Sequence, residues 1–233
     1  VGIEVHESPS LNPIDTSELE PGNVVTVEPG VYLNNKFGIR IEDIAVMRSI
    51  PNITVLSPAD CTETVKATLA AAQHDGPVYI RLTGPMNNPP VYTEDYDYEI
   101  GKAITLKEGC DVAIIATGTM VYNSQKAIEL LEEQGISCTL IDMHTIKPLD
   151  KEAIQKVLKH KLVVTVEEHS VVGGLGSAVA EYLAQQLERP AQLIIGIEDS
   201  FAHAADYQSL VEHYELTPED IANKIIKKVR EVY

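Results

Sequence analysis

One of the most apolar runs of the sequence ends with three residues that could carry out acid–base chemistry. Glu167, Glu168 and His169 directly follow residues 162–166 (LVVTV). Such a run is typical of a strand buried on both faces of a parallel sheet, and ligands bind at the carboxyl ends of these strands. A glutamate beside a histidine can hold or move a proton. We identify no nucleophile or metal partner for them, so we interpret the three residues as structural.

A glycine-rich segment follows these residues and begins a predicted helix. Residues 173–176 read GGLG, and the amino end of a helix after a strand is a common place for phosphate binding. The spacing departs from G-x-G-x-x-G because Val179 occupies the place of the third glycine. We therefore interpret these glycines as allowing tight packing of the turn.

A series of strands and helices that alternate from residue 99 onward must position these residues. Each predicted strand is rich in β-branched residues and nearly continuous in apolar ones, which indicates burial on both faces. Strands separated by helix-length segments form right-handed crossovers, and these produce a parallel sheet. We therefore expect a three-layer α/β domain with a mainly parallel sheet. The predicted strands cover residues 111–117, 137–142, 162–167 and 192–197, and the predicted helices cover residues 122–134, 151–159, 175–187 and 217–231.

Shorter elements precede this domain. Residues 54–56 and 77–82 predict two strands, separated by a helix near residues 61–74 with Asp60 as its N-cap. Before them, short alternating runs broken by turn signals indicate a small antiparallel β extension. The predicted organisation is the β extension at residues 1–43, a partial βαβ piece at residues 44–86, a linker at residues 87–98 and the α/β domain at residues 99–233.

The composition argues against several classes of function. The formal net charge is -17, which repels nucleic-acid phosphates and anionic lipid surfaces. No apolar run approaches the roughly 18 residues of a membrane span. The cysteines, Cys61, Cys110 and Cys138, stand far apart without a metal-binding spacing, as expected of reduced thiols. We therefore expect a cytoplasmic protein that binds neither nucleic acid nor membrane.

Several motifs, in order along the chain, resemble the C-terminal section of a transketolase. They are EDIAVMRSIPN at residues 42–52, LSPAD at 56–60, GPVYIR at 76–81, DMHTIKPLD at 142–150, EEHS at 167–170 and GGLGSAV at 173–179. By this resemblance the βαβ piece is a remnant of the pyrimidine-binding domain and the α/β domain is the third domain of the family. The sequence is most similar to split transketolases, in which two chains share the enzyme.

This resemblance implies a transferase that moves two-carbon ketol units between sugar phosphates with thiamine diphosphate and Mg²⁺. The family's diphosphate-binding domain and its cofactor-activating glutamate have no counterpart in these 233 residues. We therefore expect no cofactor to bind this chain alone, and we expect an N-terminal section or a homo-oligomer as its partner. Arg81 matches the family arginine that holds the substrate's phosphate in an assembled enzyme, a task that suits a guanidinium.

The first 43 residues resemble another family, the pita-bread metallopeptidases of the aminopeptidase P and prolidase type. The motifs are GIEVHE at residues 2–7, LEPG at 19–22, TVEPG at 26–30 and GIRIED at 38–43. By this resemblance Glu28 and Glu42 match two glutamate ligands of a dinuclear metal site, and His6 matches the histidine that contacts the substrate. The other ligands have no counterpart, so we interpret the metal site as incomplete and these three residues as vestigial.

The two resemblances overlap at residues 41–44 (IEDI), a string that fits both families. We interpret the chain as a chimera, natural or artificial, joined at this string. The peptidase resemblance implies a strand here and the transketolase resemblance a helix. Since most partners of the helix are present downstream, we expect a helix over residues 43–49. Residues 48–86 lack most of the sheet of the pyrimidine domain, which predicts open edges, and self-association or mobility, in this piece.

Three hypotheses of function follow. The first is a section of a ketol transferase that is inactive alone and serves assembly or dimerisation. The second is a non-catalytic chimeric α/β module. The third is a remnant of a metal-dependent X-Pro aminopeptidase. The length of the transketolase resemblance, residues 42–233, favours the first.

Overall fold

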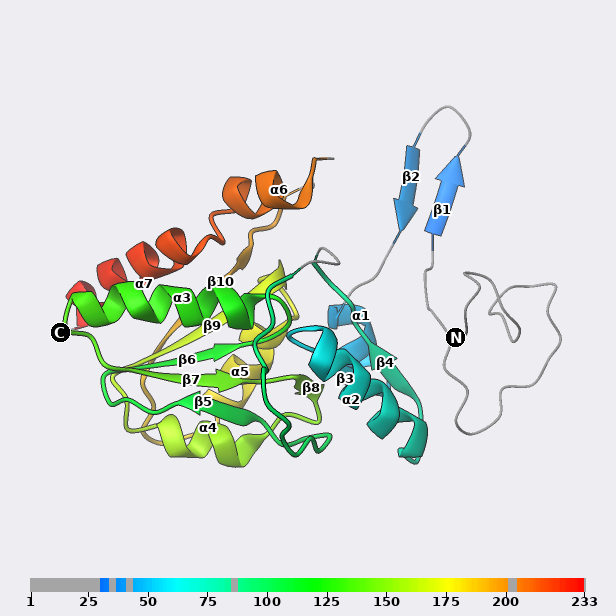
Figure 1. Ribbon diagram of the computed structural model, residues 1–233, viewed down its shortest axis with the longest axis horizontal. Coiled ribbons are helices and arrows are strands. Elements are labelled where there is room, and N and C mark those ends of the chain that lie inside the picture. The colour runs from blue at the N-terminus through cyan, green and yellow to red at the C-terminus, as the bar shows by residue number, and fades with distance from the viewer. Residues whose placement is uncertain (1–29, 34–36, 41–43, 85–87, 201–204, 233) are drawn as a thin grey trace, which may run out of the picture.

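The computed structural model describes residues 30–33, 37–40, 44–84, 88–200 and 205–232 of the chain (Figure 1). Its largest sheet contains Ile104–Lys107 (β5), Val112–Ala116 (β6), Cys138–Asp142 (β7), Leu162–Ser170 (β9) and Ala191–Ile197 (β10). The strand order is β10-β9-β6-β7-β5. Neighbouring strands from β10 to β7 are parallel, and β5 at the edge runs antiparallel to β7.

Helices cover both faces of this sheet (Figure 1). They are Met120–Glu133 (α3), Lys151–Val157 (α4), Leu175–Leu183 (α5) and Pro218–Val232 (α7). Because successive residues of a strand point to opposite sides, β6 contributes to two cores. Val112, Ile114 and Ala116 pack on the side of α3 and α7, whereas Ala113 and Ile115 pack on the side of α4 and α5. All five residues of β6 are buried, which confirms the predicted three-layer arrangement.

A second, three-stranded sheet joins the βαβ piece at residues 44–86 to the α/β domain, which is called the C-terminal domain from here on. Its strands are Thr54–Leu56 (β3), Val78–Ile80 (β4) and Thr145–Lys147 (β8), in the order β4-β3-β8. The parallel strands β3 and β4 are connected through Cys61–Gln73 (α2), and Asp60 is the N-cap of α2 as predicted. In contrast, β8 belongs to the C-terminal domain and pairs antiparallel with β3. The prediction of open edges is therefore wrong for β3, because the C-terminal domain supplies its neighbour.

The remaining elements are short. Ile44–Ser49 (α1) confirms the predicted helix from residue 44 on, and Tyr207–His213 (α6) precedes α7. Gly30–Leu33 (β1) and Phe37–Arg40 (β2) form an antiparallel pair within the predicted β extension. Across the described ranges, no helix combines the length and the apolar character that crossing a membrane requires.

The elements of the described structure that periodicity missed include β5, β8 and α6. The two strands read ITLK and TIK, which is too short and too polar for a buried-strand pattern. They nevertheless pair, β5 with β7 and β8 with β3.

Candidate functional site

The carboxyl ends of β6 and β9 lie side by side, and the polar residues gathered there form a cluster, here called the carboxyl rim. Its members are Arg48, Arg81, Thr119, Glu167, Glu168, His169 and Tyr207. Glu168 is at its centre. Its Oε2 accepts hydrogen bonds from Thr119 Oγ1 (2.6 Å) and Tyr207 OH (2.7 Å). Burial, and then the charge of Glu168, raises the pKa of Tyr207, so the phenol is a neutral donor. Glu168 thereby connects α6 to the residue before α3.

Arg81 reaches the carboxyl rim from the residue directly after β4. Its Nη2 donates to the backbone oxygen of Glu168 at 2.9 Å. Its Nε is buried and has no hydrogen-bond partner among the described residues. One side of the guanidinium is thus held against β9, and only the Nη atoms are left to meet a ligand.

Glu167 is occupied by a structural task. Its Oε2 accepts from Leu175 N and its Oε1 from Gly176 N, both at 2.7 Å. A carboxylate in this place satisfies the first N–H groups of α5 and complements the dipole of that helix. Burial raises the pKa of Glu167 to about 7, against the opposing effect of these N–H groups and of the nearby Arg81 and Arg48. With both oxygens bonded to α5, Glu167 is a helix cap.

The glycine-rich turn is packed against this cap. A Cβ on Gly174 would overlap Glu167 Oε2 and would lie 2.8 Å from His169 Nδ1. Gly173 has a φ of +82°, a left-handed conformation that glycine adopts without steric cost. The structure therefore agrees with the interpretation of tight packing, since Glu167 takes the N–H groups that a phosphate would need.

His169 and Arg48 connect the carboxyl rim to α1. His169 Nε2 accepts from Ile44 N at 3.2 Å, and its Nδ1 lies 2.8 Å from Ser170 O. These two contacts fit a neutral imidazole that carries its proton on Nδ1. Arg48 Nη1 donates to Gly173 O at 2.6 Å. His169 is therefore a positioning residue for α1 in this structure, as the interpretation of these residues as structural implies.

Sequence reasoning missed Arg48, Thr119 and Tyr207 as members of this cluster. The place of Thr119 was detectable, because it lies just beyond the carboxyl end of the predicted strand at residues 111–117. Arg48 and Tyr207 come from short helices that are distant in sequence, and no local pattern assigns them to the rim.

The remaining predicted site residues, His6, Glu28 and Glu42, lie outside the residues that the structure describes. The predicted remnant of a metallopeptidase site therefore stays a prediction. Within the described ranges, no three His, Cys, Asp or Glu side chains lie together in a way that could hold a metal ion.

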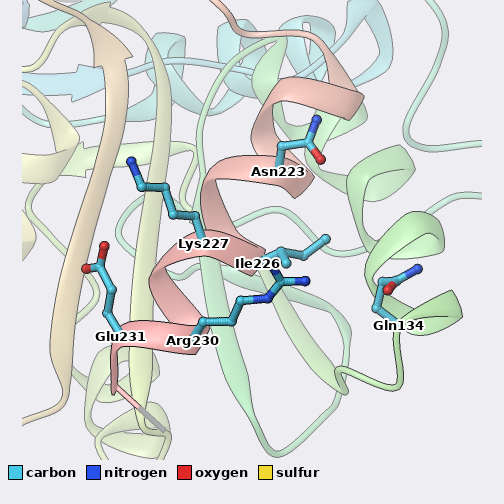
Figure 2. Close-up of a pocket in the computed structure, with 6 residues that line it drawn as sticks. All are labelled: Gln134, Asn223, Ile226, Lys227, Arg230 and Glu231. Carbon is cyan, nitrogen blue, oxygen red and sulfur yellow. The ribbon is translucent and has the colours of Figure 1, made fainter.

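A pocket lies at the opposite end of α3 from the carboxyl rim (Figure 2). Thr119 precedes α3 at the rim, whereas Gln134 follows it at the pocket. A helix of this length spans about 20 Å. The pocket is lined by Gln134, Asn223, Ile226, Lys227, Arg230 and Glu231. Its open, mixed-charge lining contributes nothing to the rim.

Three models of known protein families match parts of this chain. Residues 101–221 match the family model described as transketolase, C-terminal domain. The chain belongs to the transketolase family. Residues 40–87 match the transketolase pyrimidine binding domain, and residues 1–49 match metallopeptidase family M24. These matches confirm both resemblances, and they overlap at the string shared by the two families.

Two similar relatives are named as parts of a transketolase. A protein of Methanocaldococcus jannaschii, provisionally named a transketolase C-terminal section, is 41% identical over 192 residues, which is 81% of this chain and 60% of the relative. A 6-deoxy-6-sulfo-D-fructose transketolase subunit of a Clostridium species is 39% identical over 214 residues, 90% of this chain and 64% of the relative. The chain thus spans less than two thirds of either relative.

A solved structure has the same fold. It is described as a split-gene transketolase, an inactive tetramer of four beta chains, and it superimposes with a TM-score of 0.74 at 40% identity. The match covers 83% of this chain and 62% of that chain. The agreement extends the sequence similarity to the arrangement of the strands and helices.

The described residues of this transketolase chain do not fit a diphosphate–Mg²⁺ group. Two helices start at the carboxyl rim, α3 and α5, and α5 already has its first N–H groups bonded to Glu167. The rim offers two arginines, but the described ranges bring no set of three metal-ligating side chains together.

Replacing Gly174 with alanine tests the packed cap. We expect the free energy of unfolding to fall by about 2–3 kcal/mol, because the new methyl group overlaps the Glu167 carboxylate. In a Glu167→Ala background the same substitution meets less obstruction, and we expect it to cost at least about 1 kcal/mol less. Urea unfolding of the four proteins of this double-mutant cycle measures both costs. An equal cost in both backgrounds would contradict the packing described here.

Proposed function

We propose that the chain is the C-terminal section of a transketolase-like ketol transferase, catalytically incomplete by itself and active with an N-terminal section. The observation that carries this proposal is its similarity to a relative named as a C-terminal section and to one named as a transketolase subunit. Along this chain, the match to the pyrimidine binding domain comes before the match to the C-terminal domain. The wide spacing of the cysteines along the chain and the net charge of -17 suit a cytoplasmic protein with reduced thiols.

The proposal assigns the binding of thiamine diphosphate and Mg²⁺ to the N-terminal section. The poor fit of the described residues to such a group supports this division. The C-terminal domain then has the task of holding the pyrimidine-binding remnant in place, and the second sheet and the contacts of α1 are suited to that task.

Arg81 is the residue that we propose for binding the substrate's phosphate in the assembled enzyme. The bond to Glu168 O fixes the guanidinium at the carboxyl rim, while its Nη atoms keep hydrogens that can donate to phosphate oxygens. Because the side chain is fixed before the ligand binds, less conformational entropy is lost on binding.

A second candidate function is assembly without catalysis. The solved relative described as an inactive tetramer of four beta chains favours it, because copies of one kind of chain associate there. Under this alternative the chain forms a homo-oligomer and remains inactive with every partner.

Mixing the chain with the N-terminal section of a split transketolase separates the two candidates. With thiamine diphosphate and Mg²⁺ present, we expect ketol transfer between sugar phosphates from the mixture and none from either chain alone. A mixture that forms a complex but stays inactive would favour the assembly role. Metal-dependent cleavage of X-Pro peptides by this chain alone would contradict both and would point to the M24-like segment.

Replacing Arg81 with alanine tests the proposed phosphate contact in that reconstituted enzyme. We expect kcat/KM for a phosphorylated acceptor to fall by about 10–100-fold, because a charge-assisted hydrogen bond is lost. An unphosphorylated acceptor should lose much less. Arg189, an exposed arginine outside the rim, provides the control, since Arg189→Ala should leave both rates unchanged. Equal losses for the two acceptors would show that Arg81 acts only on the structure.

A further inference from the structure

Two buried carboxyl groups meet where the pyrimidine-binding remnant contacts the C-terminal domain. Glu63 lies in the first turn of α2, and Asp142 is the last residue of β7. Both residues are 0% exposed. The rings of Tyr92 and Tyr96 stack with their centroids 4.0 Å apart, and the hydroxyl of Tyr92 bonds to Asp142 while that of Tyr96 bonds to Glu63. A hydrogen bond between the two carboxyl groups contributes to the pKa of each. A pair of carboxyl groups at such a boundary can be stable only if their charges are reduced or balanced.

The neighbouring donors satisfy all but one of the four carboxyl oxygens. Asp142 Oδ2 accepts from Tyr92 OH at 2.6 Å. Glu63 Oε2 accepts from Ala59 N at 2.7 Å, and Glu63 Oε1 accepts from Tyr96 OH at 3.2 Å. The fourth oxygen, Asp142 Oδ1, is buried without a donor among the described residues when both groups are ionised. A proton on the Glu63 carboxyl supplies the missing donor.

No described cation hydrogen-bonds to either carboxyl group. On the side of α2, Asp60 adds a further negative charge, and Lys66 is bonded to Asp95 at 2.6 Å. On the side of the C-terminal domain, burial lowers the pKa of His144 to about 4, so its imidazole is neutral. The ring of Tyr98 packs tilted against this ring with centroids 4.3 Å apart, and burial raises the pKa of Tyr98, so its phenol is also neutral. Proton sharing is therefore the remaining way to hold the pair together.

We propose that Glu63 and Asp142 form a pH-sensitive latch between α2 and the C-terminal domain, closed while the two carboxyl groups share one proton and released as that proton is lost. Burial, and then the charge of Asp142, raises the pKa of Glu63 well above its usual range. Burial likewise raises the pKa of Asp142 to about 7. The latch rests on the buried contact itself and does not depend on the function proposed above.

The direction of the pH effect follows from the proton count. When α2 separates from β7, Glu63 meets water and returns to its ordinary acidity, so opening releases a proton at neutral pH. The equilibrium constant for opening should therefore rise with pH, by up to about tenfold per pH unit. The closed state is favoured most below the ordinary pKa of a glutamate, and the advantage is lost as the pH rises through the elevated pKa of the pair.

Hydrogen-exchange protection of the α2 amides between pH 5 and pH 8 tests the latch. In the wild type we expect the protection factors to fall by up to about tenfold per pH unit. Glu63→Gln keeps a donor for Asp142 Oδ1 but cannot ionise, so the part of the pH slope that comes from Glu63 should be lost, and its protection factors should fall less steeply with pH than those of the wild type. Glu133→Gln removes the same charge from an exposed site and should behave as the wild type does. Glu167 titrates in all three proteins, so its effect cancels in the comparison.

The same pH slope in Glu63→Gln as in the wild type would overturn the proposal. If Glu63→Gln does not fold, the carboxyl carbon resonances of the wild type decide. We expect the assigned carboxyl carbon of Glu63 to report a protonated group at pH 7, and an ionised Glu63 carboxyl at that pH would also overturn the proposal.

Discussion

The pairing of β8 with β3 is the interaction on which the rest of the structure depends. Without it, β3 and β4 would form an isolated pair of parallel strands, which is too small to be stable in water. β8 brings Ile146 into one core with Ile44, Val55 and Tyr79. The next residue of β8, Lys147, donates from Nζ to Arg48 O at 2.9 Å. The C-terminal domain thereby completes the sheet, the core and the end of α1 at once.

The carboxyl rim exists only because of this arrangement. Arg81 directly follows β4, whereas the oxygen that holds it belongs to Glu168 on β9. His169 and Arg48 make the corresponding contacts for α1. Each of these bonds crosses from one part of the chain to the other. Polar groups that could carry charge therefore serve first to hold the two parts together, and a proposed substrate contact is left to the free atoms of Arg81.

The sequence predicted those parts of the fold whose residues interact locally. Continuous apolar runs located β6 and β9, and Asp60 marked the start of α2. It could not predict β8, since TIK becomes a strand only beside an existing edge. For the site, the transketolase resemblance located Arg81, and residue type located the glutamates but not their tasks. Glu167 has the residue type of an acid or base, yet its distances to two backbone N–H groups make it a cap. Such distances depend on tertiary packing, which local pattern does not determine.

If the C-terminal domain completes the second sheet, the two sheets should unfold together. Native-state hydrogen exchange at pH 6 tests this directly, by comparing the amides of Val55 and Leu56 in β3 with that of Ile114 in β6. We expect the three amides to exchange through the same global opening, with equal free energies and the same dependence on denaturant. Exchange of Val55 and Leu56 through a separate opening of much lower free energy, while Ile114 stays protected, would contradict the account.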